Sequence, residues 1–341
     1  MSKYQEAKRC ALKYFEALEQ SSVEDLPKVL ATHLSADYEM RSVYPFREVS
    51  GVEDAANRVW GPMKTALYHM QRRQDIFMAG DNEFSDEIWV MSMGHFMGLF
   101  DNDWLGIRRT GKMASLRYSE FVCIRDGKVA KTGLFLDLIG LMHQAGAYPL
   151  PPMTGNYFIY PGPRDHNGLL FEDAPAEKTS ETLALVKRMC DELNAENDNM
   201  YCPPAVYEHS FSEDMIWYGP CGIGASYTIP RYLRQHQWPF SAGLSGKTFN
   251  GHVVRFAEGD FACWFGWPNL TNMAVGGFLG LNAGGTAADM QVVDVYSCKD
   301  GKIQENWVFI DIPWWLKQQG LDVFARTELI LNATDEHLGI K

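Results

Sequence analysis

The chain has 341 residues, of which 46% are hydrophobic, and it carries a formal net charge of −12. This length favours two domains over one, and the apolar content allows each domain a buried core. The acidic balance argues against nucleic-acid binding and against anionic membrane surfaces, because both need a basic face on the protein. No apolar stretch reaches the length of a membrane-spanning helix, so we expect no membrane partner.

Seven cysteines are scattered along the chain, and none of them forms a Cys-x-x-Cys pair. This pattern fits free thiols in a reducing compartment and argues against a zinc site. The N-terminus mixes charged residues into an amphipathic pattern and does not have the form of a signal peptide. The sequence therefore predicts a cytoplasmic location, with no metal and no cofactor.

The first part of the chain reads as helices followed by strands. Residues 7–18 carry apolar side chains at helical spacing, and a second helix is predicted over 23–34. A short strand at 37–44 and a further helix around 52–69 come next. Four strands are then predicted, at 73–79, 87–98, 113–124 and 129–136. The triplet Asp126-Gly127-Lys128 marks a hairpin turn, and a last helix ends at Gly146.

Residues 148–168 contain five prolines and three glycines, which predicts an extended linker over 148–176. After the linker the same order of elements returns. Residues 183–193 form an amphipathic helix, a helix is expected around 228–240, and Asp300-Gly301-Lys302 repeats the hairpin turn.

An internal repeat explains this return. Residues 105–146 align without a gap on residues 279–320, with identities that include both hairpin triplets and both of the aspartates Asp137 and Asp311. A repeat of this length predicts a tandem of two similar units, residues 1–147 and 177–341. Helices followed by a run of antiparallel strands indicate the α+β class rather than a parallel α/β fold.

Short motifs in both units resemble the SnoaL-like polyketide cyclase branch of the nuclear transport factor 2-like superfamily. In the first unit they are Gly106-Ile-Arg-Arg-Thr-Gly-Lys112, Asp126-Gly-Lys-Val129 and Leu134-Phe-Leu-Asp137. In the second unit they are Asp300-Gly-Lys-Ile303, Glu305-Asn-Trp307 and Ile310-Asp311. The resemblance implies two cone-shaped units, each a curved antiparallel sheet wrapped around N-terminal helices with an internal pocket. It also implies dimerisation through the sheet, either as a pseudo-dimer within this tandem chain or as a homodimer.

The resemblance also implies a catalytic acid that this chain lacks. Family members place a general acid/base aspartate directly after the tryptophan-like position, where this chain has Leu134 and Val308. Neither side chain can move a proton. The same departure supports an alternative function, a small-molecule binding protein without catalysis.

Glu120 and Asp294 are the acid/base candidates that remain. Each stands at the same repeat position, on a strand face that is otherwise apolar apart from Tyr118 or Tyr296. A carboxylate on such a face needs a partner or a raised pKa, and a raised pKa suits proton transfer next to a carbonyl group. The alternatives are a salt bridge to an arginine such as Arg117, or to Arg125, and a strand face open to solvent.

Three further groups of residues complete the sequence hypothesis. His236, whose counterpart in the first unit is Val59, is a candidate assisting base, although a lone histidine such as His236 or His95 is more often structural. Asp137 and Asp311 directly precede helices and are expected to be caps. Seven of the ten tryptophans fall in the second unit, which suggests an aromatic pocket for a small apolar or aromatic ligand. The candidate pocket residues are Trp217, Trp264, Trp307, Tyr118, Tyr296 and Asn306.

The sequence thus predicts a cofactor-independent enzyme that acts on a small apolar carbonyl compound. The reaction would be a cyclisation, isomerisation or dehydration through an enolate. Asp294 would be the acid/base with His236 assisting, and Glu120 would do the same in the first unit.

Overall fold

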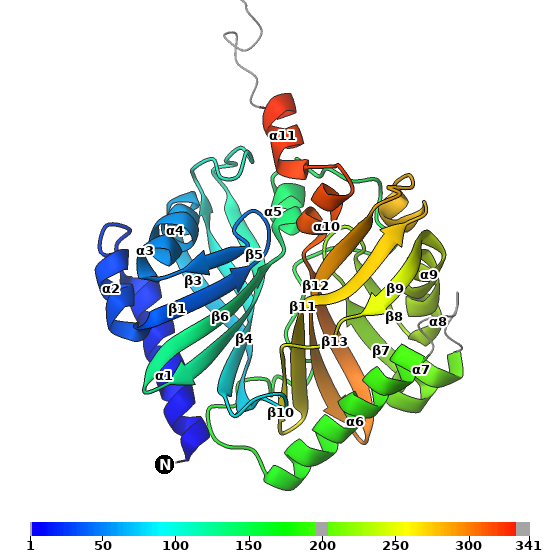
Figure 1. Cartoon of the computed structure of the whole chain (residues 1–341), viewed down its shortest axis with the longest axis horizontal. Helices are drawn as coiled ribbons and strands as arrows, with labels where there is room; N and C mark the ends of the chain where they lie inside the picture. Colours follow the sequence, from blue (N-terminus) through cyan, green and yellow to red (C-terminus); the bar gives the residue numbers. More distant parts are fainter. Residues whose placement is uncertain (1, 196–203, 332–341) are drawn as a thin grey trace, which may run out of the picture.

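The computed structural model describes residues 2–195 and 204–331, so that Cys202 lies outside the described residues. Two sheets stand face to face, and each has its own set of helices on the outer side (Figure 1). The first sheet and its helices come from the N-terminal half of the chain, and the second set comes from the C-terminal half. The α+β class and the tandem arrangement are confirmed.

The first unit places six strands in the order β2-β1-β6-β5-β4-β3. The strands are β1 (Leu34–Ser42), β2 (Glu48–Ser50), β3 (Leu67–Asp81), β4 (Ile88–Phe100), β5 (Met113–Arg125) and β6 (Lys128–Leu136). The helices are α1 (Lys3–Gln20), α2 (Leu26–His33), α3 (Val52–Asp54), η1 (Ala55–Trp60), α4 (Gly61–Ala66) and α5 (Leu138–Gln144). The predicted helix around 52–69 ends three residues early, because β3 already begins at residue 67.

The second unit repeats this plan in the order β10-β11-β12-β13-β7-β8, with β9 also paired to β11. The strands are β7 (Phe211–Tyr218), β8 (Ala225–Tyr227), β9 (Leu244–Phe249), β10 (Val254–Glu258), β11 (Phe261–Ala274), β12 (Ala287–Lys299) and β13 (Lys302–Ile310). The helical segments are α6 (Ala176–Ala195), α7 (Pro204–Ser210), α8 (Ile229–Tyr232), η2 (Leu233–Gln237), α9 (Trp238–Gly243), η3 (Phe278–Gly280), α10 (Ile312–Gln318) and α11 (Val323–Leu331).

The sheets differ from the sequence prediction in two ways. Both are mixed rather than purely antiparallel, because β1 lies parallel to β6 and β7 lies parallel to β13. The helices between β1 and the later strands supply the long connection that a parallel pair needs. In the second unit the equivalent of the long strand β3 is divided into β9 and β10. The break includes Gly251, whose φ of 101° lies outside the range of a strand.

The two sheets pack against each other through aromatic side chains. The ring of Phe265 on β11 lies 5.0 Å from that of Phe121 and 5.9 Å from those of Phe135 and Trp89. A Cβ atom at Gly133 would come within 3.2 Å of the Phe265 ring, so this position favours a residue without a side chain. The two units therefore meet through their sheets within one chain.

Two equivalent aspartates tie the units together in a reciprocal way. Asp137 and Asp311 each cap the helix that follows them, so the capping prediction is confirmed. The second carboxylate oxygen of Asp137 accepts the backbone N–H of Cys221 at 2.9 Å, and that of Asp311 accepts the N–H of Tyr44 at 2.9 Å. Residues 44 and 221 are equivalent in the repeat, so the contact obeys an approximate two-fold symmetry.

Buried charges also bridge the units. Lys8 on α1 forms an ion pair of 2.5 Å with Glu258 on β10, and both side chains are buried. Arg117 donates to the carbonyl oxygens of Val308 at 3.0 Å and Tyr218 at 3.1 Å. Arg117 therefore serves the contact between the units and is not the salt-bridge partner suggested for Glu120.

The segment between the units lies across both of them. The indole N–H of Trp307 donates to the carbonyl oxygen of Pro161 at 3.1 Å, and Leu170 donates its backbone N–H to Phe77 at 2.9 Å. The exact limits of the linker at 148 and 176 remain a prediction. Within the part of the chain that the structure describes, no helix has both the length and the hydropathy needed to cross a membrane.

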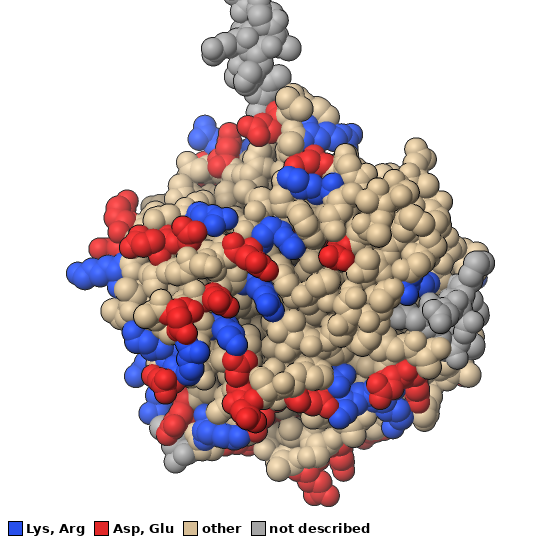
Figure 2. Space-filling model, viewed as in Figure 1, with Lys and Arg blue, Asp and Glu red and all other residues tan. Residues whose placement is uncertain are grey.

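Charge is distributed unevenly over the surface. In the view of Figure 2, acidic and basic side chains are dense over the first unit and sparse over the upper part of the second. Residues 261–288, which include β11, contain no charged side chain at all. This part of the second unit therefore carries few charged side chains.

Candidate active site in the second unit

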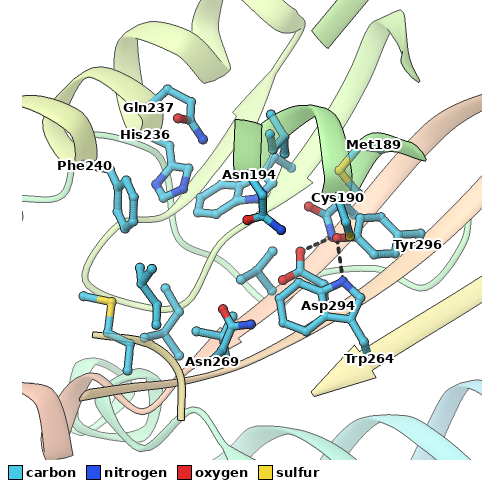
Figure 3. A pocket seen from close by; sticks show the side chains of 18 of the residues that line it. Met189, Cys190, Asn194, His236, Gln237, Phe240, Trp264, Asn269, Asp294 and Tyr296 are labelled. Carbon is cyan, nitrogen blue, oxygen red and sulfur yellow. Dashed lines mark hydrogen bonds between the residues drawn. The ribbon is translucent and has the colours of Figure 1, made fainter. Parts of the chain in front are cut away.

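The second unit has a partly open cavity of about 180 Å³ between its sheet and its helices (Figure 3). The strands β7, β11, β12 and β13 provide the floor, and α6, η2 and α9 provide the cover. Most of the lining is aliphatic or aromatic, as is usual for a small-molecule site. The polar lining residues are Asn194, Tyr232, His236, Gln237, His252, Asn269, Asp294, Tyr296 and Asn306.

Among the described residues that line this cavity, Asp294 is the only carboxylate. It is buried on β12, and the side-chain amide of Asn306 on β13 donates to it at 2.9 Å. Burial raises the pKa of Asp294 to about 7, while the hydrogen bonds from Asn306 and Tyr296 lower it in part. No lysine or arginine of the described ranges forms an ion pair with this carboxylate. Both protonation states are therefore accessible near neutral pH.

Tyr296 and Asn306 hold the carboxylate in place. The hydroxyl of Tyr296 accepts a hydrogen bond of 3.1 Å from the indole N–H of Trp264, which leaves the hydroxyl proton for Asp294 (Figure 3). Burial and the nearby carboxylate raise the pKa of Tyr296, so the hydroxyl stays protonated. Asn306 also donates to the carbonyl oxygen of Val295 at 3.2 Å. The sequence hypothesis assigned Asp294, Tyr296 and Asn306 to one site, and the structure brings the three side chains together.

His236 lines the opposite side of the cavity and stacks on Trp217, with ring centroids 4.0 Å apart and an interplanar angle of 17°. Burial lowers its pKa to about 3. The ring is therefore neutral at physiological pH, and it is a weaker base than the sequence hypothesis assumed. Its buried Nδ1 atom has no hydrogen-bond partner among the described residues.

His252 is a lining residue that sequence reasoning missed. It lies in the break between β9 and β10 and stacks on Trp264, with ring centroids 4.2 Å apart. Burial and the neighbouring Arg255 lower its pKa to about 3. Sequence periodicity could not place His252, because a residue in a strand break belongs to neither face of the sheet.

The first unit lacks this arrangement because Arg72 occupies the equivalent space. Arg72 pairs in register with Phe96 on β4, and Phe249 pairs in the same way with Leu270 on β11. Phe96 and Leu270 are themselves paired with residues of the next strand that are equivalent in the repeat. Arg72 and Phe249 therefore occupy equivalent positions in the two sheets. The Arg72 guanidinium lies 3.8 Å from the centre of the Phe15 ring, in the interior of the first unit.

Glu120 is the partner of Arg72. Its carboxylate is fully buried, lies 2.7 Å from the guanidinium and accepts a hydrogen bond of 3.4 Å from Tyr14. The alternative of a salt bridge therefore describes Glu120, although the cation is Arg72 rather than Arg117 or Arg125. Because this ion pair ties up the carboxylate, we do not retain Glu120 as an acid/base candidate.

Two predicted pocket residues lie elsewhere. Tyr118 packs inside the first unit, where it stacks on Phe96 at 4.2 Å and shares a hydrogen bond of 2.8 Å with Ser92. Trp307 stacks on Tyr218 at 5.3 Å, on the side of the sheet that faces the linker. Since neighbouring residues of a strand point to opposite faces, Trp307 cannot line a cavity that already contains both of its neighbours on β13.

Trp217 and Trp264 do line the cavity, as predicted. His95 lies outside it on β4, with a ring nitrogen 3.5 Å from the carboxylate of Asp75. Of the nine candidate site residues, the structure thus gathers six around one cavity: Trp217, His236, Trp264, Asp294, Tyr296 and Asn306.

Comparison with known proteins finds similar structures but no similar sequences. No protein-family model matches the chain, and no curated protein sequence matches it. An NTF2-like protein of Burkholderia xenovorans is 12% identical over 41% of this chain and 97% of its own, with a TM-score of 0.33. A Jannaschia protein provisionally assigned as a SnoaL-like polyketide cyclase is 17% identical over 45% of this chain and 98% of its own, with a TM-score of 0.34.

A third solved structure, of a Xanthomonas campestris protein provisionally assigned as a polyketide cyclase, is 19% identical over 42% of this chain and 99% of its own, with a TM-score of 0.33. Each of these proteins is matched over nearly its whole length, yet each covers less than half of this chain. The chain is thus similar to NTF2-like and SnoaL-like proteins at low identity.

Proposed function

We propose that the second unit binds a small, largely apolar carbonyl compound and catalyses enolate chemistry on it. Asp294 carries this proposal, because it is a buried carboxylate facing an aromatic cavity without a cation among the described residues. A group whose pKa lies near 7 can both take and return a proton at neutral pH. The reaction class is a cyclisation, an isomerisation or a dehydration.

In this scheme Asp294 removes a proton from the carbon next to the carbonyl group and later returns it to another carbon or to a leaving oxygen. Asn306 and Tyr296 keep the carboxylate oriented towards the cavity through their hydrogen bonds. The aromatic rings of Trp217 and Trp264 exclude water and favour a flat ligand. The scheme uses side chains alone, so the enzyme is proposed to work without a cofactor.

Exchange of carbon-bound protons tests the proposal without knowledge of the natural substrate. 2-Tetralone, a two-ring ketone, is incubated with the protein in D₂O, and the loss of its α-proton signals is followed by NMR. We expect exchange above the buffer rate for the wild type, and a rate about 10²–10⁴-fold lower for Asp294→Asn. Asp300→Asn, the same change in an exposed turn, serves as the control. Equal rates in the wild type and Asp294→Asn would exclude Asp294 as the base.

A ligand-binding protein without turnover is the second candidate. It is favoured by Val308, which lies opposite Asp294 in the sheet register and presents an apolar side chain to the cavity. On this alternative 2-tetralone quenches tryptophan fluorescence equally in the wild type and in Asp294→Asn, and neither protein accelerates exchange.

We also propose that the protein works in the cytoplasm as a tandem chain. All six cysteines of the described residues are free thiols, which fits a reducing compartment. The two units meet through their sheets, which is the contact that the resemblance implies for a dimer of single units. Sedimentation analysis separates a monomeric tandem chain from a dimer of such chains.

A further inference from the structure

A turn of the first unit forms hydrogen bonds with the start of β10, which lies next to the cavity of the second unit. This turn joins β3 to β4, and its Asn82 donates a side-chain hydrogen bond to the carbonyl oxygen of Val253 at 3.1 Å. The backbone N–H of Arg255 donates to the side-chain oxygen of Asn82 at 3.1 Å, and Glu83 donates its N–H to the carbonyl of Arg255 at 3.0 Å. Residues 253 to 255 are thereby fixed on the first unit.

The side chain of Arg255 is held from the same turn. Its Nε donates to the Glu83 carboxylate at 2.6 Å, and the guanidinium lies 5.1 Å from the ring centre of Phe84. Lys187 on α6 pairs with the other oxygen of Glu83. One of the two terminal NH₂ groups of Arg255, Nη1, lies 3.4 Å from Nδ1 of His252.

This contact determines the tautomer of His252. A guanidinium has donors and no acceptor, so Nδ1 of His252 must accept and cannot carry a proton. Burial and Arg255 lower the pKa of His252 to about 3, so the ring is neutral at physiological pH. The single ring proton therefore resides on Nε2, the nitrogen that is not engaged by Arg255, in a side chain that lines the cavity.

We propose that His252 is a further catalytic residue, whose Nε2–H donates a hydrogen bond to the carbonyl oxygen of the substrate. Arg255 and Glu83 are positioning residues that fix this donor from the other unit. The inference deepens the proposed function and rests on it. When Asp294 takes the α-proton, negative charge moves to the substrate oxygen, and the neutral imidazole stabilises it without giving up its proton.

The two units then have different roles at the site. The interior of the first unit is filled by Arg72 and Glu120, while its turn at 82–85 supplies the residues that orient a catalytic group of the second. The second unit depends on the first for its electrophile, and this gives a physical reason why the two units remain fused.

The first test reads the tautomer directly and needs no substrate. The full chain is labelled with ¹⁵N-histidine, and the His252 signals are assigned by their loss in His252→Gln. We expect the long-range proton–nitrogen correlation pattern of the Nε2–H form from pH 5 to 8. Arg255→Met and Glu83→Gln are expected to bring in the Nδ1–H form, whereas the control Glu87→Gln, whose carboxylate pairs with Lys131, leaves the pattern unchanged. An Nδ1–H form in the wild type overturns the inference.

The second test separates a donor from a packing residue. His252→Phe keeps a flat ring on Trp264 and removes the donor, so we expect exchange into 2-tetralone to fall by about 10²–10³-fold. His252→Gln retains an N–H at a similar reach and is expected to recover at least about one tenth of the wild-type rate. Equal rates in the wild type and His252→Phe overturn the inference.

The outcomes distinguish this inference from the function on which it rests. Loss of exchange in Asp294→Asn with full exchange in His252→Phe contradicts only the role of His252. Absence of exchange in the wild type contradicts the proposed function. In that case titration with 2-tetralone decides the inference, since a bound carbonyl shifts the Nε2 signal of His252, and an unchanged signal overturns its role as donor.

Discussion

Arg72 and Phe249 occupy the same position in the two sheets, and the difference between them decides whether the nearby carboxylate of each unit has a buried cation beside it. In the first unit the guanidinium of Arg72 pairs with Glu120 at 2.7 Å and fills the interior. In the second unit Phe249 is uncharged, and Asp294, the equivalent of Glu120, faces the cavity. The replacement of arginine by phenylalanine at this position thus separates a carboxylate held in a buried ion pair from one without a cation among the described residues.

Replacement of Asp294 by asparagine should change the pH dependence of stability. The pKa of Asp294 is about 7 in the folded state and near its ordinary value when unfolded, so the native state binds more protons between about pH 4 and pH 7. The wild type should therefore lose stability relative to Asp294→Asn as the pH rises through this range, by up to about 4 kcal/mol. Urea unfolding at pH 4, 5.5, 7 and 8.5 measures the difference.

Asp300→Asn should unfold like the wild type at every pH, because Asp300 lies in an exposed turn. A constant gap between the wild type and Asp294→Asn across the pH series would mean that the carboxylate is not perturbed in the folded protein.

Arg72 and Glu120, the buried ion pair of the first unit, should be energetically coupled. Glu120→Gln leaves the Arg72 guanidinium without a counter-charge in the core, and we expect a loss of about 3–5 kcal/mol in the free energy of unfolding. The double variant Arg72→Met, Glu120→Leu removes both charges and should recover most of that loss, since apolar replacements of a buried pair cost little. A double-mutant cycle by urea denaturation, completed with the single variants Arg72→Met and Glu120→Leu, gives the coupling energy. Additive effects would show that the pair is not coupled.

Removal of either of the two reciprocal capping aspartates should destabilise the protein by a similar amount. Asp137→Ala removes a helix cap and leaves the N–H of Cys221 without its partner, and Asp311→Ala does the same to Tyr44. We expect each to cost about 2–4 kcal/mol, the sum of a lost cap and an unsatisfied buried donor. Thermal unfolding monitored by circular dichroism, with Asp86→Ala at an exposed position as the control, measures both. A large effect for one variant and none for the other would contradict the two-fold symmetry of the contact.

Several features were predictable because they depend on local order along the chain. The repeat at a spacing of 174 residues is visible in the sequence, and it predicts two similar units before any contact is known. The alternation of residues on β12 placed Asp294 and Tyr296 on one apolar face. The position of Asp137 and Asp311 before a helix was enough to identify them as caps.

Other features depend on which distant residues meet, and these the sequence could not supply. The same reasoning treated Glu120 and Asp294 alike, because nothing near either carboxylate in the chain reveals that Arg72 reaches one of them. It assigned both Asn306 and Trp307 to the pocket, although adjacent strand residues point to opposite faces, and only the structure shows that Asn306 is the one that faces the cavity.

By itself, then, the sequence determined the α+β class, the duplication and the carboxylate positions, since periodicity and repeats are properties of neighbouring residues. Only the tertiary structure decided that Glu120 is neutralised and Asp294 is not, and that Glu83 of one unit orients Arg255 beside His252 of the other. The physical reason is that ionisation and tautomer depend on the charges within a few ångströms of a group, and in this fold those charges come from strands far apart in the chain.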